Sequence, residues 1–81
     1  MRSEGLEPEQ LAELHRRQPH ALVEEHATAE GDSFVSIDML DGRAPRHITA
    51  LAGHFVVFNG LDGEVLAQGT DFVAVLDMAG L

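Results

Sequence analysis

The chain has 81 residues and a formal net charge of −9 at pH 7, and it contains no cysteine, tryptophan or tyrosine. This length predicts one domain with a small aliphatic core, and the absence of cysteine excludes disulfides, thiolate metal sites and a cysteine nucleophile. The acidic balance argues against direct nucleic-acid binding, which requires clustered Lys and Arg.

The apolar runs are all much shorter than the ~20 residues that are needed to span a bilayer. The first five residues contain no apolar run of signal-peptide length. We therefore expect a cytoplasmic protein with no membrane partner.

A flexible start is expected over residues 1–7, followed by a single α+β domain over residues 8–81. Pro8 favours the first position of a helix, and Arg16 and Arg17 suit the negative end of its dipole. These residues predict a helix over 8–17. Pro19 then either kinks this helix or begins a second one.

A second helix is favoured over residues 19–30. Gly31 is a typical helix stop. Four side chains before it fall on one helical stripe. These are Leu22, Val23, His26 and Ala27.

The period of the apolar residues changes from helical to two after Gly31, which predicts β-strands. The expected strands cover residues 34–40, 46–51, 54–59, 64–68 and 72–77. Short connections such as Asp41-Gly42 and Asp62-Gly63 make neighbouring strands antiparallel and leave no room for crossover helices.

The segment Val35–Arg43 resembles the first strand and turn of an Sm-type barrel, and this resemblance implies a closed sheet. The predicted fold is therefore α+β, with an N-terminal helix or helix pair followed by a four- to five-stranded antiparallel meander. The sheet either stays open or closes into a small SH3-like or Sm-like barrel.

The chain from His47 to the C-terminus contains four carboxylates and no Lys or Arg. Lysine on an edge strand normally discourages unwanted strand pairing. In this part of the chain only acidic side chains are present to discourage pairing of the apolar segments 55–58 and 72–76. We expect these segments to bind a partner by edge pairing or face packing.

Two of the five arginines lie in the turn-rich segment 41–47. Arginine is enriched at interface hot spots, although these two can also pair with the chain's own carboxylates. The candidate partner-binding residues are therefore Arg43, Arg46, His47, His54, Phe55, Phe58 and Phe72.

The five histidines raise the question of metal binding or catalysis. No two of them have the i, i+4 spacing of a helical zinc site, and no Gly-x-Ser-x-Gly elbow or phosphate-binding loop is present. We assign no catalytic, metal-binding or cofactor-binding residue and expect no cofactor.

The sequence predicts a non-catalytic interaction or assembly module that binds a second copy of itself or a larger protein. One alternative is an acidic inhibitor that mimics nucleic acid and blocks a basic site on a nucleic-acid-handling protein. Another is a small hydrolase or metal-binding protein that uses His47 or His54.

Overall fold

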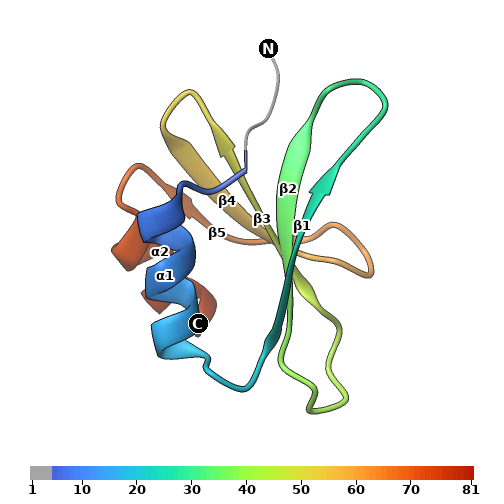
Figure 1. Ribbon diagram of the computed structural model, residues 1–81, viewed down its shortest axis with the longest axis vertical. Helices are drawn as coiled ribbons and strands as arrows, with labels where there is room; N and C mark the ends of the chain where they lie inside the picture. The colour runs from blue at the N-terminus through green and yellow to red at the C-terminus, as the bar shows by residue number, and fades with distance from the viewer. Residues whose placement is uncertain (1–4) are drawn as a thin grey trace.

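The computed structural model describes residues 5–81, which form a five-stranded sheet and two helices (Figure 1). The elements in chain order are α1 (Pro8–Arg17), β1 (Leu22–Ala27), β2 (Ser33–Asp38), β3 (Arg46–Leu51), β4 (His54–Asn59), β5 (Val65–Gly69) and α2 (Phe72–Ala79). Each strand pairs antiparallel with the next one in the chain. The predicted α+β class and antiparallel meander are confirmed, with five strands.

The sheet is open. Its spatial order is β1-β2-β3-β4-β5, so β1 and β5 are the two edges and do not pair with each other. The barrel that the sequence left open as an alternative is therefore wrong. An open sheet has two faces, and the two faces of this one differ.

Helix α1 has the bounds that the sequence predicted. The Glu7 backbone N–H donates to Gln10 Oε1 at 2.9 Å, which satisfies one of the free donors at the start of the helix. Leu14 is fully buried and anchors the helix to the core. Of the predicted flexible start, residues 1–4 lie outside the described residues, whereas Leu6 is buried in the core.

The predicted second helix over residues 19–30 is wrong, because residues 22–27 form strand β1. This strand pairs with β2 along its whole length, from Leu22 opposite Asp38 to Ala27 opposite Ser33. The apolar positions that fit a helical stripe also fit a strand, and the ladder of backbone hydrogen bonds to β2 overrides the weak local preference. Gly31, expected to stop a helix, instead lies in the β1–β2 turn with φ of 90°.

The predicted last strand over residues 72–77 is also wrong, because Phe72–Ala79 is helix α2. Asp71 caps its start, where Oδ1 accepts from the backbone N–H of Val73 at 3.1 Å and of Ala74 at 3.3 Å. Gly80 ends the helix in the left-handed conformation that favours glycine, with φ of 75°. The short apolar run suited either structure, and these caps decide in favour of the helix.

Both helices lie on the same side of the sheet (Figure 1), and α2 packs mainly on β4 and β5. The core lies between the helices and this covered face. Its buried side chains are Leu6, Leu14, Val35, Ile37, Ile48, Ala50, Phe55, Val57, Ala67, Phe72, Val75, Leu76 and Leu81.

One ion pair joins the two helices across the end of the core. Arg17 Nη1 donates to Asp77 Oδ1 at 2.7 Å, and Arg17 Nε donates to Glu13 Oε2 at 2.8 Å. The adjacent guanidinium groups of Arg16 and Arg17 lower the pKa of Glu13 to about 2. Within residues 5–81, neither helix is long and apolar enough to cross a membrane.

Candidate functional site

The site is built on the face of the sheet that the helices leave uncovered. Side chains alternate between the faces of a strand, and the registers show which positions share this face. We call it the open face, and it consists of Leu22, Glu24, His26, Phe34, Ser36, Asp38, His47, Thr49, Leu51, His54, Val56, Phe58, Val65 and Gln68. All of these side chains are half-buried or exposed, and none of them is Lys or Arg.

Four aromatic rings cross the open face from β1 to β4. His26 stacks on Phe34 with ring centroids 4.9 Å apart, and Phe34 lies 4.8 Å from His47. His47 then meets Phe58 edge-on at 5.3 Å. We call these four residues the ring ladder. Such contacts hold the rings in fixed positions, at about 0.5–1.5 kcal/mol for each pair beyond the area buried.

Polar contacts fix two histidines of this face. His26 Nε2 lies 2.9 Å from Ser36 Oγ, and His54 Nε2 lies 3.0 Å from Gln68 Oε1. Burial, and then the nearby His26, lower the pKa of His47 below its usual value. The lowered pKa favours the neutral form of the His47 ring.

The open face is hollowed where β1, β2 and β3 meet. The hollow has a volume of about 250 Å³, and we call it the open-face hollow. The Phe34 ring and the imidazoles of His26 and His47 contribute to its wall. Two carboxylates, from Glu24 and Asp38, lie at its border. The remaining lining residues are Leu22, Ser36 and Pro45.

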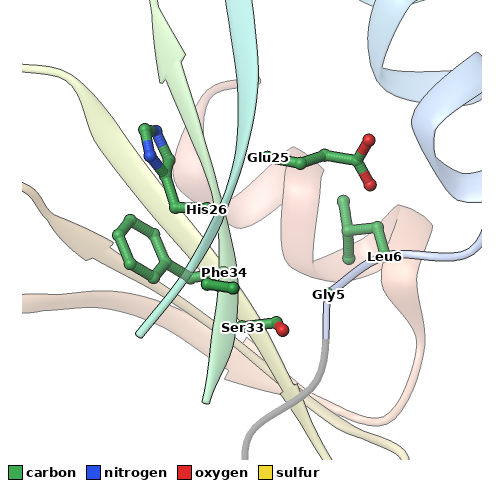
Figure 2. Close-up of a pocket in the computed structure, with 7 residues that line it drawn as sticks. Gly5, Leu6, Glu25, His26, Ser33 and Phe34 are labelled. Carbon is green, nitrogen blue, oxygen red and sulfur yellow. The ribbon is translucent and has the colours of Figure 1, made fainter. Parts of the chain in front are cut away.

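A second hollow, of about 450 Å³, lies at the opposite end of the β1–β2 hairpin. Figure 2 shows that its lining comes from both faces of the sheet, because His26 and Phe34 point to one side while Glu25 and Leu6 lie on the other. Its polar groups therefore do not converge on one point. This hollow lacks the arrangement expected of an active site.

Ser36, His26 and Glu24 are the residue types of a hydrolytic triad, but their geometry differs from one. Ser36 Oγ and Glu24 Oε2 both approach the same atom, His26 Nε2, at 2.9 Å and 3.8 Å. In a triad the carboxylate holds the other ring nitrogen, so that the first can take the proton of the serine. The contact therefore positions the His26 ring and does not activate Ser36.

Metal binding has no geometric support in the part of the chain that the structure describes. Nowhere in residues 5–81 do three or more His, Asp or Glu side chains gather as metal ligands. His47 and His54 share the open face but contact different neighbours, Phe58 for His47 and Gln68 for His54.

The structure separates the candidate residues that the sequence grouped together. His47, His54 and Phe58 lie on the open face, and Arg43 lies in the exposed loop beside it. Phe55 and Phe72 are buried in the core with ring centroids 5.2 Å apart, so neither offers a surface to a partner.

Arg46 lies on the opposite face from its neighbour His47. Its Nη1 donates to the carbonyl oxygen of Ala44 at 2.8 Å, and its Nε is buried without a hydrogen-bond partner. This position places Arg46 at the margin of the core and away from the open face.

Sequence reasoning missed His26 and Phe34, the first two members of the ring ladder. Residues 22–27 also fit a helical stripe, and a helix would not place His26 on the sheet. Phe34 was identified only as one apolar position of a strand. The signal that could have found them is the alternation of side chains in β1 and β2, which places both rings on one face once 22–27 is assigned as a strand.

Comparison with protein-family models, with curated proteins and with solved structures finds no significant match to this chain.

Proposed function

We propose that this protein is a non-catalytic assembly module that associates through the open face of its sheet, with a second copy of the chain as the occupant. The proposal rests on one observation. Two helices cover one face of the sheet, while the other face presents a ring ladder fixed by its own contacts.

The chemistry of the open face supports protein binding. Aromatic side chains are enriched at interface hot spots, because they bury a large area at a small cost in side-chain entropy. The ladder rings are already held by one another, so less freedom is lost when a partner covers them. His47 and Phe34 therefore lie at the centre of the proposed contact.

Two apolar side chains allow a matched test of this interface. Leu22 lies on the open face and is 49% exposed, whereas Met78 lies on α2 and is 60% exposed. Both can be changed to serine without opening the core. Leu22→Ser is expected to weaken self-association, and Met78→Ser is expected to leave it unchanged.

The experiment is sedimentation velocity over a range of about 1–500 μM, since mass action makes the dimer fraction depend on concentration. We expect wild-type protein to self-associate and Phe34→Ser to weaken this association by about tenfold or more. Circular dichroism would confirm that each variant is folded. A wild-type monomer across the whole range would refute the proposal, as would equal effects of Leu22→Ser and Met78→Ser.

The acidic-inhibitor alternative makes a different prediction for salt. A surface that competes through carboxylates loses affinity steeply as salt screens its charge. An interface dominated by the ring ladder responds weakly to salt. Sedimentation of the chain alone reports its self-association, and a dimer that persists at about 1 M sodium chloride, where the Debye length is about 3 Å, supports an interface dominated by the ring ladder over a purely electrostatic one.

A further inference from the structure

A self-associating open face raises an electrostatic problem at the open-face hollow. Glu24 and Asp38 bring two carboxylates to this region, and no Lys or Arg lies on the face among the described residues. Two copies placed face to face would bring four carboxylates together, which disfavours association unless a cation lies between them.

A candidate cation lies in the loop that leads into the hollow. Arg43 belongs to the loop between β2 and β3, and Pro45, two residues further on, lines the hollow itself. The Arg43 side chain is 73% exposed, and its Nε lies 3.5 Å from Asp41 Oδ2. An exposed pair of this kind contributes little to stability, so the guanidinium is available to a partner.

The other arginines in residues 5–81 are already engaged within the fold. Arg16 and Arg17 pair with Glu13, and Arg17 also pairs with Asp77. Arg46 is partly buried beside the carbonyl of Ala44. Arg16 is about as exposed as Arg43 but lies on α1, on the covered side of the sheet, so Arg43 is the exposed arginine among the described residues that lies beside the open face.

The walls of the hollow match the chemistry of a guanidinium group. Its planar face can stack on the imidazole of His26, which stacks on Phe34 on one side, and its edge donates to carboxylates in a fork geometry. Glu24 Oε2 lies 3.8 Å from His26 Nε2, which is too far for a hydrogen bond that would compete with a ligand. Asp38 accepts from the Leu40 backbone N–H through Oδ1, which leaves Oδ2 for a ligand.

We propose that the open-face hollow receives the Arg43 side chain of a second copy of this chain, where Glu24 and Asp38 neutralise it. This inference rests on the proposed self-association and names the contact that fixes the relative orientation of the two copies. In a two-fold dimer the exchange is reciprocal, because each contact from one copy to the other is matched by its equivalent. Two arginines then separate the four carboxylates.

The test uses two charge reversals that are complementary only across the interface. Arg43→Glu places acids on both sides of each contact, and Glu24→Arg places arginines on both sides. Each variant alone is expected to self-associate about tenfold more weakly or worse. An equimolar mixture of the two is expected to regain a dimer, because each contact then joins an arginine to a glutamate.

Arg16→Glu is the matched control. Arg16 is 71% exposed at the end of α1 and away from the open face, and its reversal changes the net charge by the same amount as Arg43→Glu. It is expected to change the dimer constant by about twofold or less. Arg43→Gln, which removes only an exposed charge, replaces the reversal if a reversed variant is not folded, and it should weaken the dimer by about threefold or more.

Sedimentation velocity of the single variants and their mixture tests the contact and the self-association separately. A wild-type dimer that Arg43→Glu weakens no more than Arg16→Glu would overturn the Arg43 contact and leave the proposed function standing. A mixture that associates no more tightly than its components would also overturn it. A monomeric wild-type protein would instead refute the proposed function, and with it this contact.

Discussion

Gly60 offers a way to disturb the ring ladder from outside. A Cβ atom at this position would lie 2.8 Å from His47 Nε2 and 2.8 Å from the carbonyl oxygen of Pro45. That carbonyl already accepts from the Gly60 N–H at 2.8 Å, so it cannot retreat without losing a backbone hydrogen bond. The His47 ring, held between Phe34 and Phe58, must therefore move, and the short contact with the Pro45 carbonyl adds a cost of its own.

The size of the effect follows from two opposing contributions. Overpacking of this kind costs about 1–3 kcal/mol. Replacing glycine with alanine also restricts the unfolded chain, which stabilises the fold by about 0.4–1 kcal/mol where the backbone is compatible. The φ angle of Gly60 lies outside the left-handed region, so this gain applies. We expect Gly60→Ala to lower the free energy of unfolding by about 0.5–2 kcal/mol.

Urea unfolding, followed by circular dichroism, measures this loss. Gly5→Ala is the control, because its new Cβ would meet only Ser33 Cβ at an ordinary 3.8 Å. The cost of Gly60→Ala should shrink by about 0.5 kcal/mol or more in a His47→Ala background, since the ring is then absent. An equal cost in both backgrounds would show that the Pro45 carbonyl alone sets the cost, which would contradict a His47 ring held in place by Phe34 and Phe58.

Three further predictions address the core, the cap of α2 and the pH response. Leu14→Ala should lower the free energy of unfolding by about 2–5 kcal/mol, because the side chain is fully buried, and thermal unfolding would show it; a loss below about 1 kcal/mol would place α1 away from the core. Asp71→Ala should cost about 1 kcal/mol by removing the cap of α2, whereas Asp71→Asn should retain most of the stability in the same urea assay. The folded protein lowers the pKa of His47 below 6.5, so the unfolded chain binds this proton more readily. The contribution of His47 to stability is therefore full above pH 6.5 and is lost as the pH drops through 6.5 toward the lowered pKa. His47→Gln should reduce the slope of unfolding free energy against pH between about pH 7.5 and about pH 5.5, and an unchanged slope would contradict the burial of this ring.

Local signals in the sequence predicted the correct element wherever they fitted only one kind of secondary structure. Helix α1 begins at Pro8 and ends at the two arginines, as predicted. The turn dipeptides Asp41-Gly42 and Asp62-Gly63 separate strands that pair as expected. The errors fall on two segments of about six apolar or mixed residues, where helix and strand patterns overlap. For 72–77 the deciding residues were present, since Asp71 and Gly80 are a helix cap and stop at the right separation.

Residues 22–27 are different, because no local residue decides their structure. Glu24, Glu25 and Ala27 all favour a helix more than a strand in isolation. The segment becomes a strand because β2 supplies hydrogen-bond partners along its whole length. The ring ladder also depends on this non-local pairing. His26 meets Phe34 only through the β1–β2 register, which explains why the sequence pointed to His47 and Phe58 but not to the other half of the ladder.

The same register decides which surface can serve as the interface. The sequence left edge pairing and face packing by two apolar strands as alternatives, yet one of these segments is helix α2 and the other, β4, lies inside the sheet. The actual edge strand β1 carries Glu24 and Glu25 on opposite faces, so a strand added along this edge would have to accommodate an acid on either side. The opposite edge, β5, is short, and its pairing with β4 is irregular beside Phe58. Because both edges resist strand addition in this way, the open face with its fixed rings is the surface that we propose for self-association.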